Sequence, residues 1–395
     1  MRDHLYALDV LRFCAAFAVM VFHFCFYSWA SNGASIAIMF DAAARYETLA
    51  PFTWFGWVGV QIFFVISGFV IANSAHGAAP SAFLKGRLLR LYPAAWMCAG
   101  VSLAAWMFIA HRPLAQELDD FTRSVTLWIT GPWIDDVYWS LAVEIVFYAL
   151  VFGVLVARRI VSLAAIPWLL TALCVVHDVF FGALRQFTES VLGERLFGWI
   201  DWRHDILLMQ HGAFFAIGIW LWMLSRGRMN GIRFVGLAIA FAAGLLEIIA
   251  RVRSMPQEVA YEGAMSVWPP IALWLAGVGL VVAVALRPHW LRVEHAGARR
   301  ALKRIGLMTY PLFLAHSEAG AGLLRVLITS GLDTRVALAL SMLAALVFAY
   351  TVSASAEVAI RRLLGAALDG VERALKAAAP KLAWLFSPGK DSVLD

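Results

Sequence analysis

The sequence predicts an all-α protein that crosses a membrane many times as one helix bundle. Apolar residues make up 62% of the 395 residues and charged residues only 15%, whereas soluble domains hold about 45–50% apolar and about 25% charged residues. The apolar residues also recur in blocks of about 20, which is the length that a helix needs to cross a bilayer. Together these observations exclude an ordinary soluble domain.

Ten apolar blocks predict ten transmembrane helices in a membrane domain over residues 1–356. They cover residues 8–28, 54–73, 91–110, 138–157, 161–181, 206–225, 232–250, 266–286, 306–328 and 335–356. We interpret the first block as a retained helix, because Asp9 and Arg12 lie inside it and no clear cleavage site follows. Residues 357–395 form a predicted cytoplasmic tail. It begins with apolar and charged residues on opposite helical faces, as in a helix that lies on a membrane surface.

The basic residues predict the orientation in the membrane. Most Lys and Arg residues fall in every second loop, which marks those loops as cytoplasmic, and ten spans then place both termini in the cytoplasm. This pattern accounts for the net charge of +6 without nucleic acid as a partner. The four cysteines lie in apolar runs without CxxC spacing, so we expect neither a disulfide nor a metal site; they are Cys14, Cys25, Cys98 and Cys174.

Ionisable residues inside spans are costly and are therefore the first candidates for function. In the first span, Arg12 and His23 are about three full turns apart, so they share a helix face at a separation of about 16 Å. The cation could hold a phosphate near the cytoplasmic end while the imidazole acts as a base deep in the membrane. The alternative is an Asp9–Arg12 pair at the interface and an unrelated, packed histidine.

The second span and the segment after it add polar candidates. Gly59 and Ser67 are small enough for close helix packing, and packing is the favoured interpretation for the glycines. Gln61 is a stronger candidate, because a buried amide needs hydrogen-bond partners. In the following cytoplasmic loop, Arg87 and Arg90 are three residues apart and would share a face of a helix. Two guanidinium groups suit phosphate binding, although ordinary positive charge on the cytoplasmic side is the alternative.

The fourth span begins with Trp139 and carries a polar stripe. Ser140, Glu144 and Tyr148 are spaced four residues apart and so lie on one helix face. A carboxylate inside a span must be paired or functional, and the simplest function here is to orient a histidine, as the acid of a catalytic triad does.

The ninth span contains a second histidine. His316 and Glu318 lie in its middle, and Pro311 loosens the helix nearby. From these residues alone, either His23 or His316 could be the base.

Five segments together resemble the acyltransferase-3 family of bacterial membrane acyltransferases, whose members modify lipopolysaccharide O-antigen and exopolysaccharides. The matching pieces occur in the family's order and read LDVLRFCAAFAVMVFHF, GVQIFFVISGFVI, RLLRLYP, WSLAVEIVFY and TYPLFLAH. The resemblance implies ten transmembrane helices. It also implies that His23 is the catalytic residue of an Arg–x10–His pair with Arg12, that Arg87 and Arg90 lie on the acyl-CoA side, and that Glu144 is the family's acidic residue.

The resulting hypothesis is a multi-pass O-acyltransferase of the bacterial inner membrane. It would use acyl-CoA, with acetyl as the family's commonest acyl group, as a donor substrate and hold no bound cofactor or metal. The acceptor would be a hydroxyl of a polysaccharide or lipid-linked glycan. His23 would act as a general base or be acylated transiently, with Glu144 orienting it. The alternative is a proton-coupled transporter of a small polar or glycan-linked solute, although the sequence lacks the symmetric broken helices of that class.

The loops on the outer side predict where the acceptor enters. They are rich in tryptophan, whose rings suit sugars but also form belts at membrane interfaces; the residues are Trp29, Trp54, Trp133, Trp199 and Trp202. We therefore expect a cavity that is open to both sides and narrows near His23, with Arg12 lining its inner part.

Overall fold

A computed structural model of the protein describes most of the chain as helix. The described residues are 6–110, 112–157, 160–184, 208–287, 293, 295–379 and 384–387, with side chains omitted for 180–184. Within these residues the only β-pairing is a single antiparallel bridge between Ser31 and Val259. The all-α prediction is confirmed.

Eleven described helices of 14 residues or more form the body of the molecule. They are α1 (Tyr6–Phe22), α5 (Gly59–Ala75), α6 (Pro80–Ala105), α8 (Tyr138–Val156), α9 (Ala165–Leu184), α12 (Gly212–Ser225), α13 (Gly231–Glu258), α14 (Trp268–Leu286), α15 (Ala296–Ala315), α17 (Thr334–Ala354) and α18 (Ala356–Ala378). The shorter elements are η1 (His23–Tyr27), α2 (Ser28–Ala30), α3 (Ser35–Phe40), α4 (Ala50–Thr53), η2 (Gly56–Val58), η3 (Trp106–Ala110), α7 (Leu114–Thr126) and α16 (Glu318–Thr329).

The described helices are long and apolar enough for a multi-pass membrane protein. Seven stretches qualify as candidate spans, or eight if the bent pair α15–α16 is one span. Two of the ten predicted spans, 161–181 and 206–225, correspond to the shorter apolar helices Ala165–Val179 and Gly212–Ser225. The 14 residues of α12 rise about 21 Å, less than the ~30 Å hydrocarbon core. The count of ten and the cytoplasmic termini therefore remain predictions.

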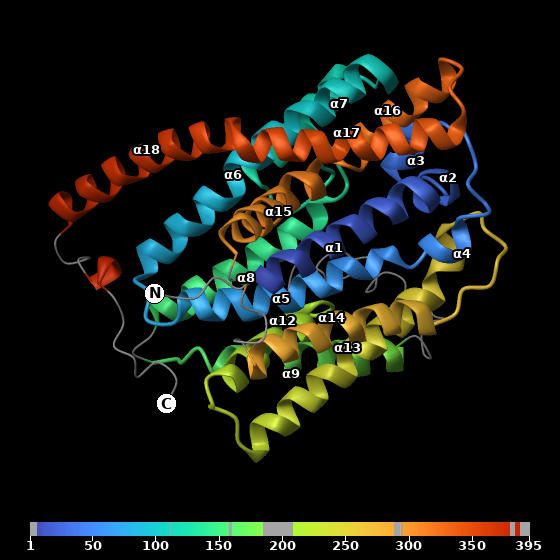
Figure 1. Ribbon diagram of the computed structural model, residues 1–395. Coiled ribbons are helices and arrows are strands. Elements are labelled where there is room, and N and C mark those ends of the chain that lie inside the picture. The colour runs from blue at the N-terminus through green and yellow to red at the C-terminus, as the bar shows by residue number, and fades with distance from the viewer. Residues whose placement is uncertain are drawn as a thin grey trace.

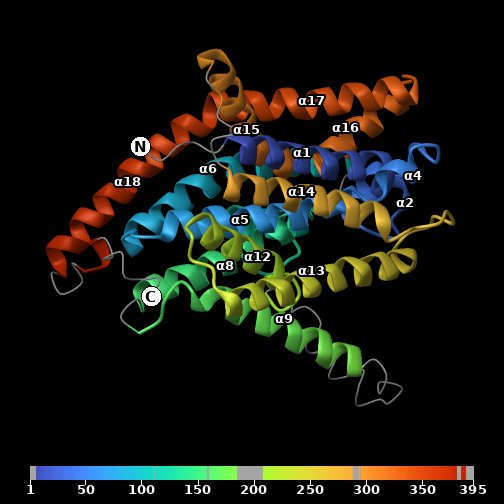
Figure 2. The ribbon, with the colours of Figure 1, turned by 60° about the horizontal axis from the view of Figure 1, so that its bottom comes forward.

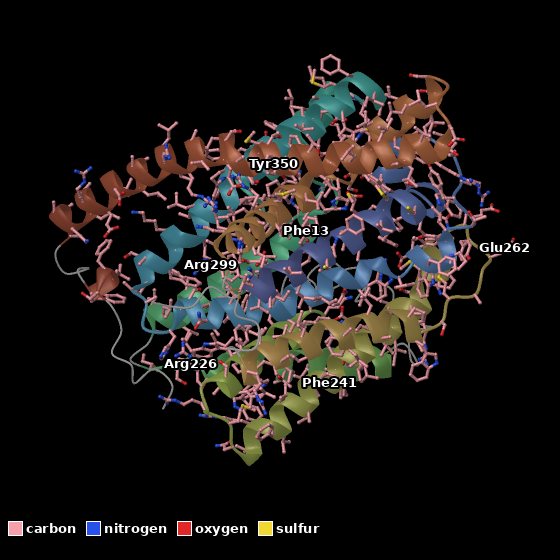
Figure 3. All side chains as sticks on the ribbon, in the orientation of Figure 1. Phe13, Arg226, Phe241, Glu262, Arg299 and Tyr350 are labelled. Atoms are coloured by element: carbon pink, nitrogen blue, oxygen red, sulfur yellow. The ribbon has the colours of Figure 1, made fainter. Side chains whose placement is uncertain are left out.

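The long helices run side by side, with α1 and α5 in the middle of the bundle. In Figure 1, α17 and α18 lie along one edge and α9 and α13 along the opposite edge. The view in Figure 2 shows α14 beside α1 and α5. Among the side chains labelled in Figure 3, Arg226 and Glu262 lie toward opposite ends of the bundle, whereas Phe241 and Tyr350 lie along its length.

Helix α5 is the most buried of the candidate spans and packs backbone to backbone. Of its apolar window 83% is buried, against 33–50% for the other six single spans. A Cβ added at Gly68 of α5 would lie 2.2 Å from a carbonyl oxygen of α12. A Cβ added at Gly218 of α12 would lie 2.0 Å from a carbonyl oxygen of α5. A Cβ at Gly59 would lie 2.5 Å from a carbonyl oxygen of α1. The glycines therefore serve close helix packing, as predicted.

Two local predictions require correction. The segment with Arg87 and Arg90, predicted as a loop before residue 91, is helical, because α6 already begins at Pro80. The predicted ninth span, 306–328, is two helices that meet at an angle of 72°. The backbone leaves the helical conformation at Ser317, with ψ at −92°. The amide of Glu318 then donates a hydrogen bond to Asp135 Oδ2 at 3.3 Å, which satisfies a donor that the break would otherwise leave unpaired.

Helix α18 forms the beginning of the predicted tail. It follows α17 directly (Figure 1) and packs against the first half of α6. Arg361 Nε donates a hydrogen bond to the carbonyl oxygen of Leu89 at 3.1 Å, and Lys85 is ion-paired with Asp369. The tail is helical through Ala378, as its sequence pattern predicts, while its location on a membrane surface remains a prediction.

Candidate functional site

Two cavities inside the bundle share part of their walls. The first, of about 210 Å³, is lined by Arg12, Arg87 and Arg90, and we call it the arginine cavity. The second, of about 280 Å³, is lined by His23 and His211, and we call it the histidine cavity. Val60 and Phe313 line both cavities. A path from one to the other would therefore pass these two apolar side chains.

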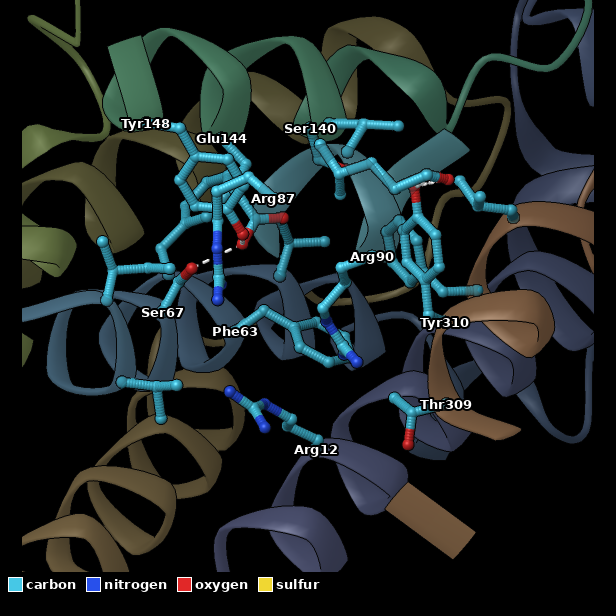
Figure 4. Close-up of a pocket in the computed structure, with 18 residues that line it drawn as sticks. Arg12, Phe63, Ser67, Arg87, Arg90, Ser140, Glu144, Tyr148, Thr309 and Tyr310 are labelled. Carbon is cyan, nitrogen blue, oxygen red and sulfur yellow. Dashed lines mark hydrogen bonds between the residues drawn. The ribbon is translucent and has the colours of Figure 1, made fainter. Parts of the chain in front are cut away.

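Five helices, α1, α5, α6, α8 and α15, place cationic and polar groups around the arginine cavity. Figure 4 shows Arg12 of α1, Arg87 and Arg90 of α6, Ser67 of α5 and the α8 residues around one space. Arg87 and Arg90 face it together because residues three apart share a helix face. Arg87 lies over the ring of Tyr148 and Arg90 over the ring of Tyr310, with Cζ 5.6 Å and 5.9 Å from the ring centroids. Such contacts hold the guanidinium planes in place.

Glu144 is the acid of the arginine cavity. Its Oε1 accepts hydrogen bonds from Ser67 Oγ and Tyr148 OH, both at 2.5 Å. Arg12 is paired with Asp9, which lies 3.5 Å away. Three arginines thus face two carboxylates, Glu144 and Asp9, and the difference is one positive charge. Arg87 Nε is also buried without a hydrogen-bond partner. A site with surplus cations and an unpaired donor is suited to an anion.

A second histidine lies behind His23, which lines the histidine cavity. His23 Nδ1 lies 2.7 Å from His316 Nε2, and His316 Nδ1 lies 3.0 Å from the carbonyl oxygen of Leu312. A carbonyl oxygen can only accept, so His316 Nδ1 carries the proton, and Nε2 of the neutral ring must accept. His23 Nδ1 is therefore the donor, which leaves His23 Nε2 as the basic nitrogen. Because His316 is fully buried and His23 lines the cavity, His23 is the one that can meet a substrate.

Both histidines lie where a helix departs from regular α geometry. His23 is the first residue of the π-helical turn η1, and π-helical turns within α-helices are frequent at functional sites. His316 ends α15 at the bend before α16. These two irregular turns let side chains from α1 and α15 approach each other.

The structure separates the predicted site residues into two groups and brings both histidines together. Seven line the arginine cavity, namely Arg12, Ser67, Arg87, Arg90, Ser140, Glu144 and Tyr148. Three line the histidine cavity, namely His23, Gln61 and Trp139. Asp9 is the ion-pair partner of Arg12, as the alternative interpretation of that pair expected.

The expected contact between Glu144 and His23 is replaced by another arrangement. Among the described residues, the hydrogen bonds of Glu144 run to Ser67 and Tyr148, and that of His23 runs to His316. The physical reason is position, because Glu144 lines the arginine cavity and His23 the histidine cavity. His316, and not Glu144, is therefore the hydrogen-bond partner of His23.

Sequence reasoning missed a third histidine, His211, and its hydrogen-bond partner Glu247. His211 Nδ1 lies 2.8 Å from Glu247 Oε1, and both side chains are buried. They come from the start of α12 and from α13 and line the histidine cavity. Both lie in predicted spans, 206–225 and 232–250, so the cost of burying ionisable groups in a membrane was a signal that could have found them.

Three of the five tryptophans that were expected to contact sugar can be located in the structure. Trp29, Trp54 and Trp133 line neither cavity, and Trp199 and Trp202 lie outside the described residues. The tryptophans that do line the histidine cavity are Trp57 and Trp139.

Comparisons with known proteins agree with the resemblance in the sequence. The acyltransferase-3 family model, described as an acyltransferase domain, matches residues 5–355. A curated relative, the exopolysaccharide production protein ExoZ of Rhizobium meliloti (strain 1021), is 24% identical over 276 residues, which are 67% of this chain and 76% of that protein. No solved structure matches significantly.

Proposed function

The chain belongs to the acyltransferase-3 family, and on this premise we propose that it transfers an acyl group from acyl-CoA to a hydroxyl of a cell-surface or exopolysaccharide carbohydrate. Acetyl is the proposed acyl group, and the bacterial inner membrane is the proposed location. The relative ExoZ is named for exopolysaccharide production, which supports a carbohydrate acceptor. Family membership also favours transfer over proton-coupled transport of a solute.

The observation that carries this proposal is the pair of cavities that meet at Val60 and Phe313. The arginine cavity offers cations for the phosphates of coenzyme A. The histidine cavity offers a base on the far side of the shared wall. A donor held by its phosphates in the first cavity would extend its thioester arm past the wall toward His23, so only the arm and the acyl group need to cross.

The orientation of His23 determines the proposed chemical step. His23 Nε2 takes the proton of the acceptor hydroxyl while the hydroxyl oxygen bonds to the acyl carbon. The carbon–sulfur bond then breaks, and coenzyme A leaves as a thiol with that proton. His316 holds the ring of His23 through Nδ1 and stabilises the positive charge that develops on it. Alternatively, His23 Nε2 could attack the thioester first and form an acyl-histidine. A burst of thiol release before glycan acylation would identify that route.

Two measurements test the proposed function. Mass spectrometry of surface glycans from strains with and without the gene should show an acyl mass that depends on the gene. The purified protein in lipid nanodiscs should release the thiol of acetyl-CoA when exopolysaccharide from the strain without the gene is added. Glycans of equal mass in both strains, together with no thiol release, would refute the assignment.

A further inference from the structure

We infer that the histidine cavity is the acceptor site and that it is built for a neutral sugar, with Trp57 and Gln61 as the residues that hydrogen-bond its hydroxyls. The inference rests on the proposed function and names the class of acceptor. It follows from three properties of the cavity, namely its unpaired polar atoms, its paired charges and its aromatic rings.

Trp57 and Gln61 provide an unpaired donor and an unpaired acceptor. Trp57 Nε1 and Gln61 Oε1 are both buried without a hydrogen-bond partner. The two residues are only 7% and 4% exposed, and both line the histidine cavity. Trp57 lies in η2, directly before α5, and Gln61 lies in the first turn of α5. A buried polar atom without a partner is costly, and a sugar hydroxyl, which both donates and accepts, could satisfy the two atoms together.

The charged groups of the cavity are paired within the protein. The carboxylate of Glu247 accepts from His211 at 2.8 Å, and the amide of Gln61 lies beside the same carboxylate. Arg251 is ion-paired with Glu258. Among the described residues, Arg251 is the only lysine or arginine that lines this cavity, and it is already ion-paired, so an anionic acceptor would lack a free guanidinium here, in contrast to the arginine cavity. This favours a neutral acceptor over a uronic acid or a phosphorylated sugar.

Aromatic side chains form part of the wall of the histidine cavity. Trp57, Trp139 and Tyr27 line the cavity with His23, and the ring of Trp139 packs against that of His211 at 5.3 Å between centroids. Flat apolar faces beside hydrogen-bonding groups suit a sugar ring, which has C–H faces and hydroxyl edges. A sugar bound between these rings would present a hydroxyl in the cavity that His23 lines.

The test compares conservative variants of the two hydrogen-bonding residues with a matched control. Trp57→Phe removes the indole N–H and keeps an aromatic ring, and Gln61→Leu removes the amide at nearly constant size. Trp220→Phe is the control, because Trp220 Nε1 is also buried without a partner but lines neither cavity. The full-length proteins in nanodiscs receive acetyl-CoA and 4-nitrophenyl glycosides in matched pairs, glucoside with glucuronide and galactoside with galacturonide. Thiol release and product mass are measured.

We expect the wild type to acylate a neutral glycoside and to discriminate against its uronide by about tenfold or more. Trp57→Phe and Gln61→Leu should each raise KM for the neutral glycoside roughly tenfold, as for one lost hydrogen bond, while KM for acetyl-CoA changes little. Trp220→Phe should behave as the wild type does.

A preference for the uronide, or thiol release that no neutral glycoside stimulates, would overturn the inference. So would variants that raise KM for acetyl-CoA and leave KM for the glycoside unchanged. These results differ from failure of the proposed function, in which the wild type releases no thiol with any acceptor and the glycans of the cell do not depend on the gene.

Discussion

The arginine cavity and the histidine cavity share α5 and two wall residues, yet their electrostatics differ. In the first, three arginines exceed the carboxylates that face them. In the second, Glu247 is hydrogen-bonded to His211 and Arg251 is ion-paired with Glu258. Buried charge without a partner is costly unless a ligand supplies one. The difference supports our proposal that the arginine cavity binds the anionic donor and the histidine cavity a neutral acceptor.

The largest expected effect comes from removing the base of the histidine cavity. His23→Ala should lower kcat for glycan acylation by about 10²–10⁴, the usual contribution of a general base, because the cavity loses the nitrogen that takes the hydroxyl proton. Measured thiol release from acetyl-CoA should fall in parallel. His177→Ala is the control, since His177 lines neither cavity. Near-normal acylation by His23→Ala would remove this residue from the chemistry.

Removing cations from the arginine cavity should change donor binding instead. Arg87→Ala or Arg90→Ala loses a charge-assisted hydrogen bond, which is worth about 1.5–3 kcal/mol. KM for acetyl-CoA should rise by about 10- to 100-fold in each variant, with a smaller change in KM for the acceptor. Lysine should restore only part of the loss, because its ammonium lacks the planar fork.

Arg304→Ala serves as the control for these variants, since Arg304 lies over Tyr350 and lines neither cavity. A double Arg87→Ala, Arg90→Ala variant that is fully active at limiting acetyl-CoA would show that the cavity does not bind the donor by its phosphates.

A smaller effect is expected at the histidine behind the base. His316→Ala should lower kcat by about tenfold, because His23 loses the acceptor that sets its tautomer and orientation. His316→Gln should recover part of the rate, since its amide oxygen can accept from His23 Nδ1. The measurement is kcat at saturating donor and acceptor. Equal rates for the Ala and Gln variants would argue that His316 contributes packing alone.

The smallest effect tests which chamber opens to which side of the membrane. In a variant without the native cysteines, Val19→Cys places a thiol in the histidine cavity and Ile71→Cys places one in the arginine cavity. The protein is placed in sealed vesicles whose inside corresponds to the cytoplasm. An impermeant thiol reagent added outside should label the thiol at position 19, and acetyl-CoA inside the vesicles should slow this labelling modestly. The thiol at 71 should be labelled only from the inside. Labelling of both thiols from the same side would show that donor and acceptor enter together.

Much of the fold could be predicted from composition and span length alone, because a helix that crosses a bilayer must be apolar and about 20 residues long. The helical spacing of Arg87 and Arg90, and of Ser140, Glu144 and Tyr148, correctly placed these side chains on shared faces. Periodicity describes one helix at a time, however. It could not show that α15 stops at His316, since the break depends on hydrogen bonds from Glu318 to the distant Asp135.

The sequence predicted which residues line the cavities better than it predicted which of them hydrogen-bond to each other. All three arginines and His23 line a cavity, but the partner of His23 comes from another helix almost 300 positions away in sequence. Glu144 was the predicted partner of His23 because it is an acid inside a span. In the structure, its carboxylate accepts hydrogen bonds from the hydroxyls of Ser67 and Tyr148 instead. Which groups meet across a bundle is decided by helix packing and by irregular turns such as η1, and neither leaves a local pattern in the sequence.

The glycine contacts of α5 have a consequence for how a substrate could move through the protein. With its backbone pressed against α1 at Gly59 and against α12 at Gly68, α5 cannot tilt without separating three packed helices, a collective motion of microseconds or longer. A rotation of Phe313 about its own side-chain bonds would be a far smaller rearrangement, on the nanosecond scale for a side chain with room to turn. If a substrate arm passes between the two cavities, the packing of α5 therefore favours movement of the Phe313 side chain over movement of a whole helix.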